Sequence, residues 1–155
     1  MATFSFKSSG KTQAQQVVEK TTTTLTPVGI KTPIRLGTKE GIFEMSYALS
    51  EQVGDNLRNL LLTNTGDRLG LFDFGANLRP LMSEFTSQEN FDVEAVTRIK
   101  AAVSRWMPYI ELDSFLSEVN RNDNKNTAVI NVTITYNVPA LNLKGRKIEL
   151  VLYAM

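Results

Sequence analysis

The spacing of apolar residues changes from helical to alternating towards the C-terminus. From Met45 to Leu61 apolar residues recur at intervals of four and three, which places them on one face of an α-helix. We expect this helix to end near Thr63, because the following Asn64-Thr65-Gly66 contains residues that tolerate a left-handed cap. The pattern therefore predicts a helix over residues 45–63.

Two further helical segments are predicted before the alternation begins. A structured loop over residues 67–75 leads into a short helical piece from residue 77 to about residue 85. A longer helix is predicted over residues 91–106, where apolar residues again recur at intervals of three and four. Acidic residues near its start suit the positive end of the helix dipole, and Pro108 stops it.

The remaining residues alternate between apolar and polar side chains. Residues 110–113 form a short predicted strand, and residues 120–126 a polar turn. Residues 128–139 place Ile, Val and Tyr on one face and Asn and Thr on the other, as in a half-buried strand. A loop containing Gly145 precedes a last strand over 147–153. The fold class is therefore α+β, with about three helices followed by an antiparallel β meander.

The first thirty residues differ from the rest in composition. Residues 1–30 are rich in Thr, Gln, Ser and Lys and show no apolar period. They form an extended or flexible N-terminal arm, and two interpretations stay open: a disordered tail, or a segment that orders on a partner. Residues 31–155 are expected to form a single α+β domain.

Composition removes whole classes of chemistry. The chain has no Cys and no His, which excludes thiolate metal sites, a cysteine nucleophile and an imidazole base. We therefore expect no metal, no cofactor and no small-molecule substrate. The net charge is +1, with basic ends too dilute for a nucleic-acid stripe. No apolar run approaches the roughly 20 residues that span a bilayer, and no secretory signal is seen, so we expect neither nucleic acid nor membrane as a partner.

One enzymatic alternative survives these exclusions. A glycosidase needs only two carboxylates, one of them kept protonated by an apolar pocket. Glu84, Glu89 and Asp92 lie among phenylalanines and could supply such a pair in a muralytic glycosidase. Acids beside a helix start are far more often solvated caps. The glycine-rich stretch over residues 66–75 lacks the Lys and Ser or Thr of a phosphate-binding loop.

The strand pair near the C-terminus suggests an interaction function. An edge strand leaves backbone N–H and C=O groups available, and another chain can add a strand to them. The alternative is an ordinary meander whose edge is blunted by Lys144, Arg146 and Lys147.

A run of residues after the first helix resembles a known family. Residues 60–68 read Leu-Leu-Leu-Thr-Asn-Thr-Gly-Asp-Arg, and Phe74-Gly75 follows. This pattern resembles the short baseplate wedge subunit of contractile-tailed bacteriophages, which has a counterpart in type VI secretion baseplates. The likeness covers about residues 40–155. The motif residues are Thr63, Gly66, Asp67, Arg68, Phe74, Gly75 and Pro108.

One departure concerns the segment after the third predicted helix. The family usually carries Glu-Pro-Arg there, and this chain has Met107-Pro108-Tyr109. We expect an apolar surface to take over the contacts of those charges. Trp106, Met107 and Tyr109 are thus the candidates for contact with neighbouring wedge subunits, although Trp106 is also explained as a core anchor.

The resemblance implies a non-enzymatic virion component. It implies a place in the tail baseplate after assembly in the host cytoplasm, with other baseplate wedge proteins and the tail sheath protein as partners. It also implies that the C-terminal strand pair resembles the strand-exchange element of the sheath, so that sheath assembly starts by strand addition at residues 127–138 and 146–154. The candidate sheath-contact residues are Ile130, Val132, Thr133, Ile134, Tyr136, Ile148, Leu150 and Leu152.

Overall fold

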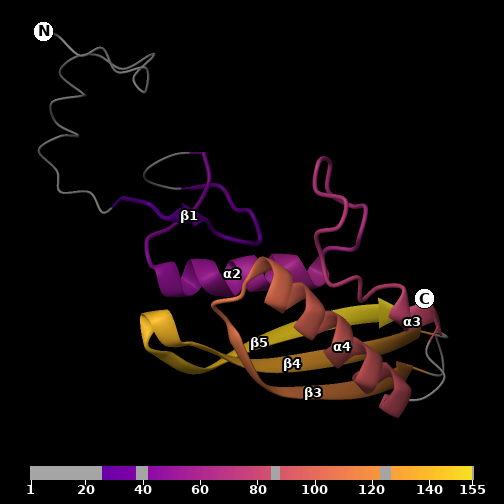
Figure 1. Ribbon diagram of the computed structural model, residues 1–155. Coiled ribbons are helices and arrows are strands. Elements are labelled where there is room, and N and C mark those ends of the chain that lie inside the picture. Colours follow the sequence, from indigo (N-terminus) through magenta and orange to yellow (C-terminus); the bar gives the residue numbers. More distant parts are fainter. Residues whose placement is uncertain (1–25, 38–41, 85–87, 123–126, 155) are drawn as a thin grey trace, which may run out of the picture.

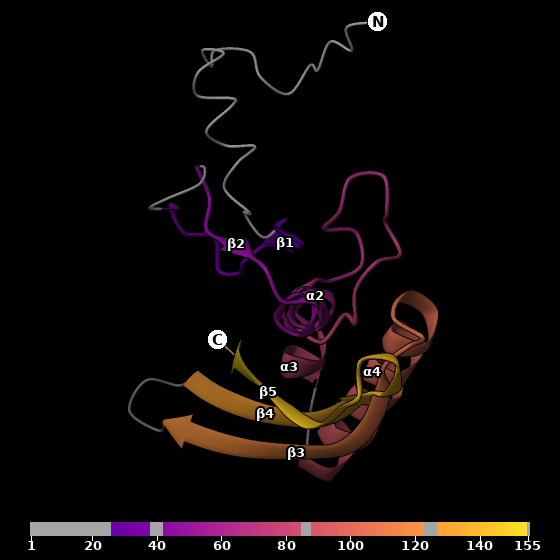
Figure 2. The same cartoon turned by 90° about the vertical axis from the view of Figure 1, so that its left-hand side faces the viewer.

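The chain folds as helices packed on one face of an antiparallel sheet, with a small hairpin beside them (Figures 1 and 2). The computed structural model describes residues 26–37, 42–84, 88–122 and 127–154. Residues 1–25 of the predicted arm lie outside this range. The elements are β1 (Gly29–Ile30), β2 (Met45–Ser46), α2 (Leu49–Leu62), α3 (Leu81–Glu84), α4 (Gln88–Trp106), β3 (Glu111–Asn122), β4 (Thr127–Val138), the 3-10 turn η2 (Pro139–Leu141) and β5 (Leu143–Ala154).

Helix α2 confirms most of the first predicted helix but starts four residues later. Met45 lies in β2 instead, where it pairs with Ile30. The apolar period extended the prediction too far, because Ser46 is fully buried and the hairpin holds this segment extended.

The helix ends near Thr63, as expected, and its C-cap Thr63 is extended. Both the N–H and the hydroxyl of Thr63 donate to the carbonyl of Asn59. Of the residues expected to provide a left-handed conformation, Gly66 has a positive φ of 94°, but it lies in the loop and not at the cap.

The expectation of about three helices needs a correction. Only α2 and α4 are full helices in the described residues, and α3 is a single turn over Leu81–Glu84. The predicted helix does not begin at residue 77, because Asn77 has a positive φ of 52°, which lies outside the α-helical range. Helix α4 confirms the helix predicted over residues 91–106 and also includes Gln88 to Asn90.

The sheet has the order β3-β4-β5 and is antiparallel throughout. Strand β3 runs over twelve residues, so the prediction of a short strand at 110–113 and a turn from residue 120 was wrong. Serines and charged residues obscure the alternation of apolar and polar side chains in this strand, although Phe115 and Val119 both pack against the core. Strand β4 confirms the central prediction. Strand β5 starts earlier than expected, and Gly145 takes a positive φ of 62° within it.

The core lies between the helices and the inner face of the sheet. Helices α2 and α3 contact β5, and α4 contacts β3 (Figure 2). In the part of the chain that the structure describes, no helix covers the opposite face, which carries the Asn and Thr side chains of β4. Burying apolar side chains on one face only is the arrangement that an alternating strand requires. The largest fully buried side chains are Phe91, Leu57, Leu60, Leu61, Leu78, Ile130, Ile134 and Leu150.

Candidate functional site

The family-like motif forms a loop that we call the motif loop, residues 63–75. Its first turn is fixed by Asp67, whose carboxylate accepts hydrogen bonds from the backbone N–H of Asn64 at 3.0 Å and from the Asn64 side chain at 3.1 Å. Gly66 has a φ of 94° and donates its N–H to the carbonyl of Phe72 at 2.7 Å. The polar motif residues therefore shape the loop itself.

The end of the motif loop is tied to helix α2. Gly75 has a φ of 120°, and a Cβ atom there would lie 2.3 Å from the carbonyl oxygen of Thr63. The next residue, Ala76, donates its N–H to the carbonyl of Leu60 at 3.1 Å. Only glycine allows the backbone to approach the end of α2 this closely at that φ.

Aromatic contacts join the motif loop to helix α4. The guanidinium of Arg68 lies 3.9 Å from the centre of the Phe74 ring, and Phe74 meets Trp106 edge to face at 5.2 Å between ring centres. Arg105 forms an ion pair with Asp73. Trp106 is thereby engaged within the molecule, while the tip residues Leu69 and Phe72 are largely exposed.

Residues 106–109, which were predicted to form a contact surface, differ in their exposure to solvent. Met107 is only 5% exposed and belongs to the core, because its N–H still bonds to the carbonyl of Val103 and continues the inward face of α4. It is therefore not available for contact with a wedge subunit. Pro108 follows in the turn that ends with the Ile110 N–H bonded to the Met107 carbonyl at 3.0 Å. Tyr109 is exposed, and partial burial raises the pKa of its hydroxyl.

The candidate sheath-contact side chains lie mostly inside the molecule. All of them except Thr133 are at most 8% exposed and pack under the helices. Strand β4 is the central strand, so β3 and β5 already occupy both of its edges. Direct strand addition to residues 127–138 is therefore excluded, and a contact through β5 must use its backbone and outer face. The buried candidates are Ile130, Val132, Ile134, Tyr136, Ile148, Leu150 and Leu152.

Among the described residues, no strand pairs with the edge of β5 that faces away from β4, and we call this the free edge. Arg58 on α2 donates from Nη2 to the carbonyl of Glu149 at 2.6 Å, which indicates that this carbonyl points away from β4. Because backbone groups in an antiparallel strand alternate in direction, the groups of Val151 and Tyr153 face the same edge. Their side chains are exposed on the outer face. Arg58 was not among the residues that the sequence singled out, since only the fold places it beside β5.

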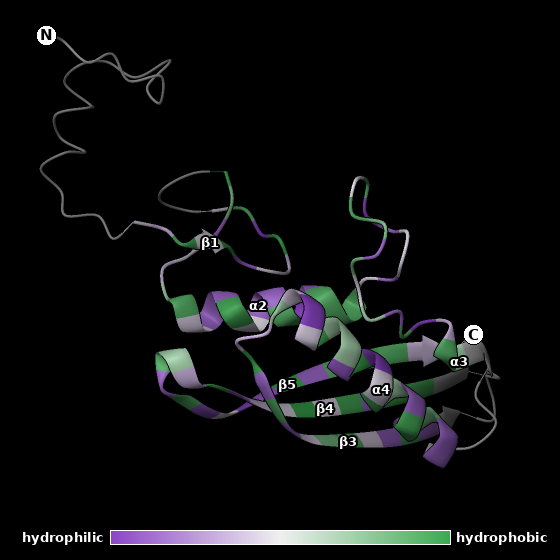
Figure 3. Cartoon of the chain, viewed as in Figure 1, coloured by the Kyte–Doolittle hydropathy of each residue, from purple (hydrophilic) through white to green (hydrophobic). Residues whose placement is uncertain are grey.

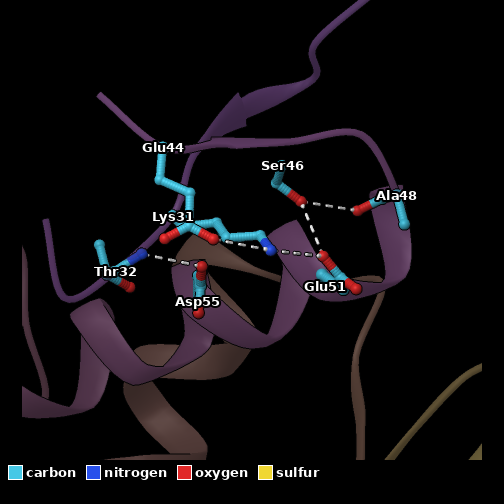
Figure 4. A network of polar contacts seen from close by, with 7 residues as sticks. All are labelled: Lys31, Thr32, Glu44, Ser46, Ala48, Glu51 and Asp55. Atoms are coloured by element: carbon cyan, nitrogen blue, oxygen red, sulfur yellow. Dashed lines mark hydrogen bonds and ion pairs between the residues drawn. The ribbon is translucent and has the colours of Figure 1, made fainter. Parts of the chain in front are cut away.

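A second feature missed by the sequence is the N-terminal hairpin, residues 26–37 and 42–46. Figure 4 shows how polar contacts attach it to the start of α2. Thr32 donates its N–H to the carboxylate of Asp55 at 3.0 Å, and Lys31 lies 3.3 Å from Glu44 and 3.8 Å from Glu51. Both the hairpin and the motif loop contain hydrophobic residues, coloured green in Figure 3. Several of these side chains in each segment are exposed. In the hairpin they are Val28, Ile30, Ile34, Leu36, Ile42 and Phe43.

The three candidate catalytic acids do not form a described pair. The side chain of Glu84 lies outside the described residues, and Glu89 is exposed in the first turn of α4. Asp92 accepts a hydrogen bond from the hydroxyl of Ser117 on β3. Within the described ranges no group of three acidic residues is placed to hold a metal ion, and no helix is both long and apolar enough to cross a membrane.

The fold is similar to that of a solved structure of low sequence identity. One chain of the anti-feeding prophage baseplate is 16% identical, with a TM-score of 0.51, and the match covers 79% of each chain. A Geobacter sulfurreducens protein that carries the provisional name tail lysozyme is 23% identical, with a TM-score of 0.46 over 68% of this chain and 89% of that one. No curated protein matches the chain significantly.

A family profile covers most of the folded part. Residues 48–142 match the family described as baseplate wedge protein gp25, and this range contains α2, the motif loop, α4 and most of the sheet. The N-terminal hairpin lies outside it. The chain therefore belongs to the gp25 family of baseplate wedge proteins, structural components of the phage tail baseplate.

Proposed function

We propose that this wedge protein joins larger wedge subunits through its projecting segments and starts tail sheath assembly by strand addition to β5. Family membership supports the place in the baseplate. The observation that carries the sheath step is the free edge of β5, a twelve-residue strand with an outward carbonyl at Glu149. An unpaired edge of that length is a template for a strand from another chain.

The outer face of β5 suits a protein partner. Val151 and Tyr153 are exposed there, next to Glu149 and Lys147. An added strand forms main-chain hydrogen bonds, and its alternate side chains contact those of its neighbour. The outer face thus offers apolar and charged positions that select the sequence of the added strand. We propose a sheath strand as the occupant.

The wedge contact uses a different surface. The motif loop and the N-terminal hairpin project on the side of α2 away from the sheet (Figure 1). Leu69, at 98% exposed, and Phe72 lie on the motif loop, and Ile34 and Leu36 on the hairpin. Exposed apolar groups of this size mark interaction surfaces when they gather on one side. Larger wedge subunits would bury them, together with the exposed Tyr109. The arm was predicted over residues 1–30 and the domain over residues 31–155, but Gly29–Ile30 forms β1 of the hairpin. We further propose that the rest of the arm, residues 1–25, adds to this wedge contact.

The test separates the two surfaces by mutation in cells that produce the complete tail. Val151→Pro removes one outward N–H from an edge strand, where proline is tolerated. This variant is expected to enter wedges and to leave the sheath unattached, whereas Val151→Ala keeps the N–H and supports attachment. The double variant L69S/F72S is expected to fail at wedge entry. Mass spectrometry of purified particles and electron microscopy of the tails measure both steps. Normal sheath on Val151→Pro tails would rule out the strand mechanism.

We also propose that the protein is not an enzyme. Glu89 is exposed in the first turn of α4, and Asp92 accepts a hydrogen bond from Ser117. Neither arrangement places two carboxylates on opposite sides of a substrate. Purified full-length protein is expected to release no more soluble fragments from peptidoglycan than buffer does. Release that Asp92→Asn abolishes would instead establish the glycosidase alternative.

A further inference from the structure

A charged groove runs between helix α2 and the beginning of strand β5. Its volume is about 620 Å³. Residues 50–58 of α2 form one wall and residues 146–149 of β5 the other, with Lys31 and Thr32 at one end. The groove therefore opens directly beside the free edge of β5.

Positive charge in the groove exceeds the negative charge available to neutralise it. Four cations and three acids line the groove, a net charge of +1. Glu51 pairs with Lys31, and Asp55 keeps its charge because the Thr32 N–H that it accepts is neutral. Within the described ranges Arg146 and Lys147 have no ion-pair partner, and the only bond of Arg58 goes to a neutral carbonyl. A carboxylate entering the groove would meet Arg58 and Arg146, two cations without a carboxylate partner, while the side chain of Lys147 lies on the outer face of β5.

A hydroxyl group at the back of the groove adds a hydrogen-bond donor. Tyr136 lines the groove, and a Cβ at Gly54 would lie 3.2 Å from its oxygen, so a glycine at this position keeps α2 clear of the hydroxyl. Burial raises the pKa of Tyr136, Arg146 lowers it and Asp55 raises it, with a net rise. The hydroxyl therefore keeps its proton at neutral pH and can donate a hydrogen bond to a carboxylate.

Arg58 connects this groove to strand addition. Its guanidinium occupies the Glu149 carbonyl, which an added strand would need as an acceptor. We propose that the strand added to β5 carries an acidic side chain, which binds Arg58 in the groove and releases the Glu149 carbonyl to the new ladder. This inference rests on the proposed function and specifies the partner: an extended segment with Asp or Glu opposite the first half of β5. A carboxylate is a stronger acceptor for a guanidinium than a carbonyl is.

Synthetic peptides test the inference on the full-length protein. The probes are peptides of about ten residues of alternating Thr and Val, blocked at both ends, with either Glu or Gln at one central position. A third peptide has Gln there and a free C-terminal carboxylate, which separates side-chain from terminal recognition. Fluorescence anisotropy gives the dissociation constants, and NMR shifts of the Val151 and Tyr153 amides show that the peptide lies at the β5 edge.

Wild-type protein is expected to bind the Glu peptide about tenfold more tightly than the Gln peptide. In Arg58→Met the two peptides are expected to bind about equally, and the Gln peptide at least as tightly as to wild type, because the Glu149 carbonyl is free. Arg58→Lys should keep part of the preference. Arg79→Met removes an exposed arginine away from the groove and should keep all of it.

Four results would overturn the inference. Two concern the wild type: equal affinity for the Glu and Gln peptides, and no binding of either at the β5 edge. The third is a preference for Glu that Arg58→Met leaves intact, which would place the acid elsewhere. The fourth is a preference for the free terminus, which would contradict recognition of a side chain. The proposed function is judged separately by sheath attachment in Val151→Pro, which does not depend on Arg58.

Discussion

The motif loop and the N-terminal hairpin project from the same side of α2, yet they are attached to it by different kinds of bond (Figure 1). The motif loop continues from the end of α2 and returns to it through backbone hydrogen bonds from Ala76 to Leu60 and from Asn77 to Thr63. The hairpin meets α2 through side chains, with Asp55 and Glu51 as the acceptors. We therefore expect the motif loop to unfold together with the core and the hairpin to open on its own.

This difference in attachment corresponds to a difference in the sequences of the two segments. Family-like residues of the motif loop, such as Gly66, Asp67 and Gly75, fix its backbone, and Leu69 and Phe72 are exposed at its tip. The hairpin lies outside the family match, and a two-stranded hairpin alone is marginally stable in water. We therefore expect mutations in the motif loop to lower global stability and mutations in the hairpin to act locally.

The largest effect is expected for Gly75→Ala. Its Cβ would meet the Thr63 carbonyl oxygen at 2.3 Å, at a φ of 120° that L-residues rarely adopt. Strain and displacement together should lower the free energy of unfolding by about 3 kcal/mol. Urea denaturation of the full-length protein, followed by circular dichroism, measures this change.

Gly70→Ala is the matched control for that substitution. Gly70 also has a positive φ, of 82°, but a Cβ there meets nothing within 4 Å. Gly70→Ala should therefore lower the free energy of unfolding only by the conformational strain of the positive φ, about 1 kcal/mol. Equal losses for the two variants would show that the close approach of Gly75 to α2 does not matter, and the comparison between the segments would lose its main support.

The sequence predicts the periodic elements well and the attachments poorly. Helix α4 and strand β4 follow from apolar spacing because packing on one face decides their side chains. The true start of α2 and the length of β3 depend on partners far along the chain, namely the pairing of Met45 with Ile30 and the contacts of Phe115 with the core. Arg58 gave no sequence signal, since its carbonyl partner is 91 residues away.

Effects of intermediate size are expected for two aspartates, one in the motif loop and one that holds the hairpin. Asp67 and Asp55 each accept a backbone N–H at 3.0 Å, from Asn64 in the motif loop and from Thr32 in the hairpin. Asp67→Ala should lower the global free energy of unfolding by about 1 kcal/mol. Asp55→Ala should leave it unchanged and instead raise amide exchange of the hairpin about fivefold, seen at Val28 and Lys31. A global loss in Asp55→Ala equal to that of Asp67→Ala would show that the hairpin folds with the core.

The smallest effect is expected for Lys31→Ala. Its ammonium group lies 3.3 Å from Glu44 and 3.8 Å from Glu51, but all three side chains are well exposed, at 38%, 41% and 54%. Exposed ion pairs contribute little, so the free energy of unfolding should change by less than about 0.5 kcal/mol. Hairpin exchange should rise less than in Asp55→Ala, and added salt should remove the difference from wild type. A larger effect that persists at high salt would show that the Lys31 stem packs the hairpin onto α2 and that the attachment is not only polar.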